Sequence, residues 1–145
     1  MASAKEVVDR ALQAWRARDA EALAQCYAAD AVIAASGGIE ARGPEGELMF
    51  FTAWSEAFPD NELTVDREYI AGAVVVQEAT FTGTHTGNLV APDGTVIPPT
   101  GRRLSGPYVA IVVVEDGLIT SDRLYYDRLD MLEQLGLIPE PATGS

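Results

Sequence analysis

The sequence predicts an α+β cone in which N-terminal helices pack on a strongly curved sheet, mixed but mostly antiparallel, that encloses an apolar pocket. Apolar residues recur at helical spacing between residues 4 and 58, and they alternate with polar residues in the segments that follow. An Asp-Gly pair at positions 116–117 is a strong hairpin signal between two of the alternating segments. Helices followed by long antiparallel strands favour α+β over a doubly wound parallel sheet.

Two helices are expected near the N-terminus. Ser3 and Glu6 form the S-x-x-E pattern of a capping box, and apolar residues follow with helical spacing, which predicts a helix over residues 4–18. Asp19 is a residue type that caps helices well, and it predicts a second, short helix that extends through Tyr27.

A strand and a third helix are expected next. Residues 31–35 have the small, apolar composition of a short buried strand, which the Gly-Gly pair at 37–38 ends. Pro44 is typical of the first turn of a helix, and apolar residues follow it at spacings of three and four. This third helix is expected to end before Pro59.

The sequence of the C-terminal half predicts long strands and one loop. The segment 87–101 contains three Pro and three Gly, and it is expected to be a mobile loop near the pocket mouth. A short helix that ends at Gly136 follows the last strand. Residues 1–138 are expected to form a single domain, with a flexible tail at 139–145. The predicted strands cover residues 63–70, 74–86, 103–114 and 118–126.

Composition and charge narrow the classes of function. A formal net charge of -12 argues against nucleic acid and against an anionic membrane surface as partners, because both require basic patches. Cys26 is the single cysteine, so no intrachain disulfide can form, and the first residues lack the apolar region of a signal peptide. These features predict a cytoplasmic protein. With one histidine and no H-E-x-x-H or C-x-x-C motif, no metal site is expected.

Six stretches of the chain carry a family resemblance. They are AWRARD at 14–19, AWSEAFPD at 53–60, TGTHTG at 82–87, PPTGRR at 98–103, EDGLI at 115–119, and the segment 127–136 with its Gln-Leu-Gly. Taken in this order, they span about residues 5–138, and the chain resembles the SnoaL-like polyketide cyclases. That family is a branch of the nuclear-transport-factor-type superfamily of cystatin-like α+β cones.

The resemblance implies an enzyme without cofactors that closes a ring by intramolecular aldol condensation of a hydrophobic polyketide. It also implies that the acid/base group is Asp127, which stands nine residues before the glycine of Gln-Leu-Gly. Considered without the resemblance, Asp127 is better explained as the N-cap of the last helix. Within an apolar pocket, desolvation would raise the pKa of its carboxyl into the range useful for proton transfer.

The other candidate residues are one histidine and several aromatics. His85 is expected to point inward from a strand, as a catalytic partner or as a buried histidine bonded to a backbone carbonyl. If the last strand stays regular, Tyr125 shares a face with Asp127 and would bind a developing enolate oxygen. Large aromatic side chains are typical of a core, and they would also offer a flat surface against which a planar ligand packs. The substrate-binding candidates are Trp15, Tyr27, Trp54, Phe58, Tyr108 and Tyr125.

Two further functions stay open at this point. A related isomerase, hydratase or hydroxylase would use the same pocket, since one fold hosts many reactions. A small-molecule-binding protein without catalysis is favoured by apolar residues at positions that are often polar in the family, namely Ala34, Ala110 and Val113. The orientation of Asp127 discriminates between them, because a solvent-facing Asp127 that only caps a helix weakens both enzyme interpretations.

The predicted sheet has an apolar outer face as well as an apolar inner one. Alternating residues on neighbouring strands are too apolar for both faces to be in water. We therefore expect a homo-oligomer, namely a dimer through this outer face, and the resemblance implies the same. The residues concerned are Val74, Val76, Val109, Ile111 and Val113.

Overall fold

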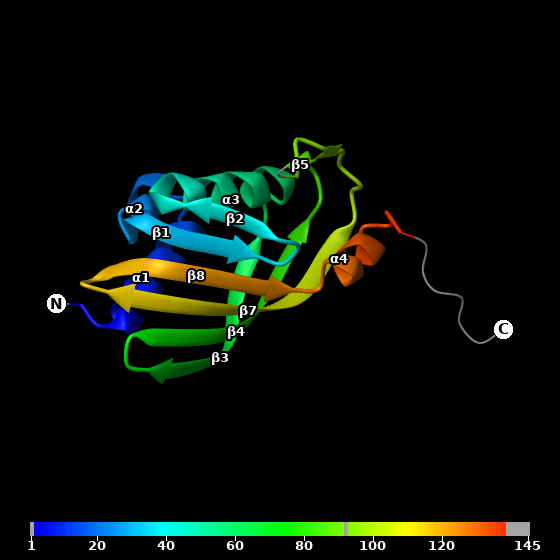
Figure 1. Ribbon diagram of the computed structural model, residues 1–145. Helices are drawn as coiled ribbons and strands as arrows, with labels where there is room; N and C mark the ends of the chain where they lie inside the picture. Colours follow the sequence, from blue (N-terminus) through cyan, green and yellow to red (C-terminus); the bar gives the residue numbers. More distant parts are fainter. Residues whose placement is uncertain (1, 92, 139–145) are drawn as a thin grey trace.

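The computed structural model describes residues 2–91 and 93–138, which form four helices and eight strands (Figure 1). The helices are α1 (Ala4–Arg16), α2 (Ala20–Ala24), α3 (Gly43–Ala57) and α4 (Arg128–Gln134). The strands are β1 (Tyr27–Ala35), β2 (Ile39–Arg42), β3 (Glu62–Ala71), β4 (Val74–Thr84), β5 (Leu89–Val90), β6 (Val96–Ile97), β7 (Arg103–Glu115) and β8 (Leu118–Tyr126). The tail predicted at 139–145 lies outside the described residues.

The main sheet has six strands in the order β2-β1-β8-β7-β4-β3. Strand β1 runs parallel to β8, whereas the other neighbouring strands are antiparallel. Helix α1, which is seen behind the sheet in Figure 1, packs on β4 and β7, and α3 packs on β1. The predicted α+β fold with a mixed, mostly antiparallel sheet is therefore confirmed.

Register shifts between paired strands bend this sheet. One lies between Val65 and Arg67 in β3, and another lies between Val113 and Val114, where β7 pairs with β8. An extra residue in one strand of a pair bends that strand and increases its twist. The resulting curvature wraps the sheet around the N-terminal helices and leaves a space between the two layers.

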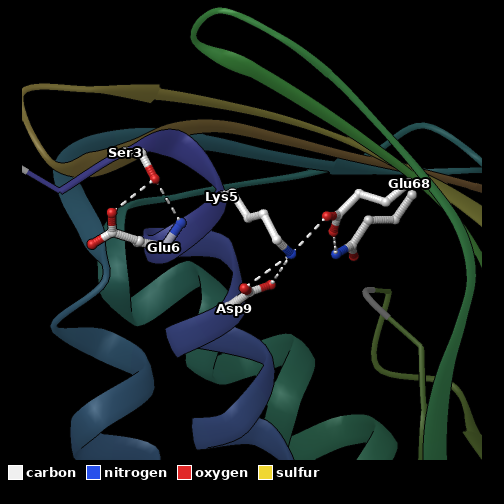
Figure 2. A network of polar contacts seen from close by, with 6 residues as sticks. Ser3, Lys5, Glu6, Asp9 and Glu68 are labelled. Atoms are coloured by element: carbon white, nitrogen blue, oxygen red, sulfur yellow. Dashed lines mark hydrogen bonds and ion pairs between the residues drawn. The ribbon is translucent and has the colours of Figure 1, made fainter.

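The helix caps follow the predicted sequence signals. The Ser3 hydroxyl accepts a hydrogen bond of 3.2 Å from the Glu6 backbone N–H, and the two side chains also contact each other (Figure 2). Asp19 caps α2 by accepting from the Ala22 N–H at 3.1 Å. Each cap satisfies a backbone donor that has no partner within the first helical turn.

The second helix is shorter than the prediction. Helix α2 ends at Ala24, and Tyr27 is the first residue of β1 rather than the last of a helix. The Ile119 N–H donates to the Cys26 carbonyl at 2.8 Å, and Tyr27 pairs with Ile119 of β8. Pairing with a strand about 90 residues away thus overrides the local helix signal, as tertiary contacts often do.

The segment 87–101, which the sequence predicts to be a loop, contains a short strand pair. It contains the short pair β5–β6, in which Leu89 is opposite Ile97. The turn between the strands closes with a 2.8 Å hydrogen bond from the Ala91 N–H to the Thr95 carbonyl. Leu89 is buried in the same apolar cluster as Ala57 and Phe58, and β5 packs on α3, so this side chain helps to anchor the segment.

Among the described residues, no helix is both long and apolar enough to cross a membrane.

Candidate active site

A cavity of about 170 Å³ lies between the helices and the inner face of the sheet. Its wall is mainly apolar and aromatic, with contributions from α1, α3, β4, β7 and β8. Such enclosed apolar spaces with a few polar groups are typical of small-molecule sites. The most prominent apolar residues in the wall are Val8, Leu12, Phe50, Phe81, Leu104 and Met131.

Trp15 forms a fixed part of this wall. Its indole N–H donates to the Asn61 side-chain oxygen at 3.0 Å, and its ring meets Phe51 edge-on with centroids 5.0 Å apart. Asn61 is only 3% exposed, and its side-chain amide donates to the Phe58 carbonyl at 2.9 Å. A buried hydrogen bond of this kind sets the orientation of an aromatic side chain that packing alone would leave free.

Trp54 forms a second aromatic wall, and Phe58 supports it from behind. The Trp54 and Phe58 rings are stacked at 5.9 Å, and Trp54 meets Tyr126 edge-on at 5.9 Å. Trp54 and Tyr126 line the cavity. Phe58 is fully buried and does not line it, so its predicted contact with substrate is replaced by packing beneath Trp54.

Besides Asp127 and Asp130 near the start of α4, polar side chains from four other elements interrupt the apolar wall. Tyr27 begins β1, Glu47 lies in the second turn of α3, Gln77 lies in β4 and Asp122 lies in β8. The Tyr27 hydroxyl donates a hydrogen bond of 2.7 Å to the Asp122 carboxylate. Glu47 is 6% exposed and Gln77 is 5% exposed. Buried polar groups of this kind are costly without partners, so their presence in a cavity wall indicates a use.

The strand register explains why Asp122 faces the cavity. It lies opposite Val112 on β7 and Ile33 on β1, and both of these neighbours are buried in the cavity wall. Directly paired residues on adjacent strands point to the same face of a sheet. Asp122 therefore projects inward between two apolar neighbours.

Burial and mutual proximity shift the pKa values of this group in the same direction. The pKa of Glu47 is raised well above 4.5, mainly by desolvation and then by the charge of Asp122, while Tyr27 opposes the rise. Desolvation also raises the pKa of Asp122, and the hydrogen bond from Tyr27 again opposes it. Desolvation and the neighbouring Asp122 raise the pKa of the Tyr27 hydroxyl. The buried Glu47 carboxyl and the half-buried Asp122 carboxyl therefore favour a state that retains a proton.

The carboxyl pair has no cationic partner within the described ranges 2–91 and 93–138. The ion pairs found there are Lys5–Asp9, Lys5–Glu68, Arg42–Glu40 and Arg67–Glu78. The same residues contain no cluster of three or more His, Cys, Asp or Glu side chains suited to a metal ion.

A surface network holds Gln77. Its amide nitrogen donates to the Glu68 carboxylate at 2.9 Å, and Glu68 is bound in turn by Lys5 at 2.9 Å. Lys5 also contacts Asp9 at 3.1 Å, so α1, β3 and β4 meet through these side chains (Figure 2). The hydrogen bond from Gln77 is the largest cause of the lowered pKa of Glu68. This network directs the Gln77 amide nitrogen toward β3.

Asp127 lies at the rim of the cavity and caps α4. Its carboxylate accepts from the Asp130 N–H at 3.0 Å, and the residue is exposed. Strand β8 ends at Tyr126, so the regular alternation that would place Tyr125 and Asp127 on one face stops before Asp127. Tyr125 is 50% exposed, and Tyr126 takes the inward position instead.

His85 lies behind the aromatic wall. It is fully buried, stacks on Phe58 at 5.2 Å and does not line the cavity. Its Nδ1 contacts the Thr100 hydroxyl at 3.0 Å and accepts from the Thr100 N–H at 3.3 Å. Burial lowers the pKa of the imidazole. This geometry ties the end of the segment 87–101 to β4.

Of the residues predicted for the site, the structure brings five to the cavity wall, and it places His85, Phe58 and Tyr125 elsewhere. The five are Trp15, Tyr27, Trp54, Tyr108 and Asp127. Glu47 and Asp122 were missed, although each carries a sequence signal. Glu47 stands one helical turn before the buried Phe51, and Asp122 alternates with Leu124 on the inward side of a strand. A charged residue on an otherwise apolar face indicates a polar site in a core.

A curved sheet and helices that enclose an apolar cavity with polar groups in its wall define a cone fold of the nuclear-transport-factor and ketosteroid-isomerase type. A SnoaL-like protein from Jannaschia sp. CCS1 shares this fold with a TM-score of 0.82 at 23% identity, over 94% of this chain and 93% of that one. IdmH from Streptomyces antibioticus shares it with a TM-score of 0.75 at 29% identity, over 92% and 98% of the two chains.

The chain belongs to the SnoaL-like polyketide cyclase family, whose model matches residues 5–135. The family resemblance seen in the sequence is therefore confirmed. The aklanonic acid methyl ester cyclase DnrD from Streptomyces peucetius is 35% identical over 98 residues, which are 67% of this chain. The chain spans 64% of the length of that relative.

Proposed function

We propose that the protein binds a hydrophobic polyketide-like ketone in its cavity and catalyses a cofactor-independent, acid/base catalysed intramolecular aldol ring closure. The observation that carries this proposal is the presence of carboxyl groups in the wall of an enclosed apolar cavity. Membership of the SnoaL-like family and the likeness to an ester cyclase support it. The whole reaction needs only a base, an acid and a site that positions two carbonyl groups.

The apolar wall suits this chemistry in two ways. Its aromatic members, above all Trp15 and Trp54, offer flat surfaces on which a polycyclic ligand can lie. A ligand that lies against this wall would displace water, so a carboxyl group in it keeps a raised pKa and the enolate is protected from proton exchange with solvent. Holding both reacting carbonyls of one chain in a near-attack geometry supplies a further part of the rate.

The acid/base residue implied by the family resemblance is Asp127, and this assignment stays a prediction. Its place on the rim is compatible with contact to a bound substrate. Its exposure and its bond to the Asp130 N–H are what a helix cap requires. For His85, the contacts with Thr100 and Phe58 support a role in holding the segment 87–101. In the proposed reaction His85 transfers no proton.

The direct test is turnover of a polyketide ester. The methyl ester of aklanonic acid, which the curated relative is named for, is incubated with the purified protein, and products are separated by liquid chromatography and mass spectrometry. A ring-closed isomer of unchanged mass is the expected product. Quenching of Trp15 and Trp54 fluorescence reports binding in the same samples. Tight binding without turnover would contradict the enzyme proposal and favour a binding protein.

A pair of matched variants tests whether the ligand binds in the cavity or on the surface. Ala110 lies in the wall and is 6% exposed, so Ala110→Phe fills part of the cavity. This variant is expected to lose both ligand quenching and turnover. Met49 is 67% exposed on α3, and Met49→Phe should leave both unchanged.

A further inference from the structure

We propose that Glu47 and Asp122 act together as the acid and the base of the cavity, with Tyr27, which is hydrogen-bonded to Asp122, as the proton relay between them. The inference rests on the proposed function and deepens it, because it names the groups that move the proton. Three separate elements, α3, β1 and β8, bring these side chains to one wall. Their convergence in an otherwise apolar wall is the first observation that supports the proposal.

The hydrogen bonds distinguish the two carboxyl groups. Asp122 accepts the Tyr27 hydroxyl proton at 2.7 Å, an interaction that stabilises a carboxylate. Within the described parts of the chain, no hydrogen bond of standard geometry ends on the Glu47 carboxyl, although that residue is only 6% exposed and lines the cavity. A nearly buried polar group without such a bond, facing a cavity, is placed to meet a ligand.

We infer that the two carboxyl groups together hold one proton at neutral pH, because no cation among the described residues neutralises them. The titratable groups that act on Glu47 are Asp122 and Tyr27, and Asp122 also acts on Tyr108 of the neighbouring strand β7. None of these is a cation, and the ion pairs of the described residues lie elsewhere. Two close carboxylates cannot both ionise cheaply in a desolvated site, so one retains its proton at neutral pH. Tyr27 selects Asp122 as the ionised member.

The aldol reaction can then be written with all atoms balanced. The Asp122 carboxylate removes the proton from a carbon beside a ketone, and the electron pair of that C–H bond is held as the enolate. The enolate carbon forms a bond to the second carbonyl carbon of the same chain, and the carbonyl π pair moves to its oxygen. That alkoxide takes the proton of the neutral Glu47 carboxyl.

The pair is reset without any external reactant. After the reaction Asp122 carries a proton and Glu47 is ionised, so one proton must pass between them. The Tyr27 hydroxyl is bonded to Asp122 and lines the same cavity wall as Glu47, so it is the group placed to relay this proton. Substrate and product are isomers, and no oxidant, reductant or cofactor takes part.

The decisive variants are Glu47→Gln and Asp122→Asn. Glu45→Gln, at an exposed position of the same helix, is the matched control, and Asp127→Asn tests the rival assignment at the rim. The first two are nearly isosteric and remove the proton-transfer group, so each should lower kcat by about 10²–10⁴-fold. The double variant should lose little more than either single variant, because residues that act as a unit are not additive. Glu45→Gln should stay within a few-fold of the original protein, and Glu47→Asp should recover part of the activity.

A measurement without substrate tests the pair separately. Infrared difference spectroscopy at pH 7 should show the carbonyl band of a protonated carboxyl that shifts in D₂O, and Glu47→Gln should abolish it. Asp127→Asn should retain the band. The band of the protonated carboxyl can be measured on the original protein, so this test does not depend on whether the variants fold.

The outcomes distinguish a failure of the Glu47–Asp122 pair from a failure of the proposed function. Turnover that survives in both Glu47→Gln and Asp122→Asn would overturn the pair and leave the proposed function intact. A folded protein that shows the protonated carboxyl and binds the ester but never turns it over would remove the proposed function, and the catalytic assignment with it. Turnover that disappears in Asp127→Asn alone would return the role to Asp127.

Discussion

The Tyr27 hydroxyl donates a 2.7 Å hydrogen bond to the Asp122 carboxylate and so joins the start of β1 to the middle of β8. This bond is the strongest local reason for Asp122 to be ionised inside an apolar wall, because it opposes the effect of burial on the pKa of that carboxyl. Losing the hydroxyl should therefore change the protonation of the site without changing its shape.

Tyr27→Phe is predicted to shift the pH profile of turnover. Without the hydrogen bond the pKa of Asp122 rises further, so the acidic limb of kcat/KM should move to higher pH. At pH 7 we expect a loss of roughly 10-fold, in line with about 1.4 kcal/mol for a charge-assisted hydrogen bond. A pH–rate profile with unchanged position and only a lower plateau would indicate that Tyr27 merely packs.

Glu47→Gln is predicted to stabilise the protein at neutral pH while it removes activity. The folded-state pKa of Glu47 is raised above 4.5, so the folded state binds more protons than the unfolded state once the pH exceeds that value. The stability of the original protein is then lost as pH rises from about 4.5 through the folded pKa. Gln does not ionise and avoids this loss.

Thermal unfolding at a series of pH values measures this effect. The difference in melting temperature between Glu47→Gln and the original protein should grow with pH above about 4.5 and be small below it. Glu45 is an exposed neighbour on α3, and Glu45→Gln serves as the control with no such trend. A pH-independent difference for Glu47→Gln would contradict a neutral carboxyl at this position.

Local sequence patterns predicted the elements well because caps, helical spacing and alternation act within a few residues. Ser3, Asp19 and the Asp-Gly pair at 116–117 each mark a boundary that the structure keeps. The start of β1 was mistaken for helix, because Tyr27 is held by β8, a strand about 90 residues away.

The inward face of β8 shows why the site was harder to predict than the fold. Between Val113 and Val114 the register of β7 and β8 shifts, so Ile119 and Asp122 both point inward although they are three residues apart. A strict alternation from Ile119 would have sent Tyr125 into the cavity. A bulge of this kind follows from the pairing of two strands and leaves no simple mark in the sequence.

Asp127 should behave as a helix cap in a stability measurement. Asn caps nearly as well as Asp, so Asp127→Asn should change the free energy of unfolding by only a few tenths of a kcal/mol, whereas Asp127→Ala should cost about 1 kcal/mol. Chemical denaturation of the two variants measures both values. If Asp127→Ala were as stable as Asp127→Asn, the bond to the Asp130 N–H would have no part in holding α4.

The outer face of the sheet supports the prediction of a dimer. Val76 is paired with Ile111 and flanked by Tyr69, which is 53% exposed, so an apolar strip crosses β3, β4 and β7. We expect light scattering to give about twice the chain mass of 15.5 kDa. Ile111→Lys should reduce this to the mass of one chain, whereas Leu129→Lys on α4 should not. A single-chain mass for the unaltered protein at micromolar concentration would refute the dimer.

His85 is predicted to make the protein less stable in mild acid. Its Nδ1 accepts from the Thr100 N–H, so a proton on that nitrogen would cost a buried hydrogen bond, and burial lowers the pKa of the imidazole below 6.5. As pH falls, the unfolded state takes up the proton first. The contribution of His85 is therefore full above about 6.5 and is lost as pH falls from there through the folded pKa.

His85→Asn isolates this contribution, because the Asn oxygen can accept the same hydrogen bond but does not titrate in this range. Its unfolding free energy, measured by urea denaturation between pH 5 and pH 8, should fall less steeply toward acid than that of the original protein. Turnover at pH 8 should stay within a few-fold, since His85 lies behind Phe58 and does not line the cavity. A loss of 10²-fold or more at unchanged stability would instead mean that His85 takes part in proton transfer, as its position in the sequence first indicated.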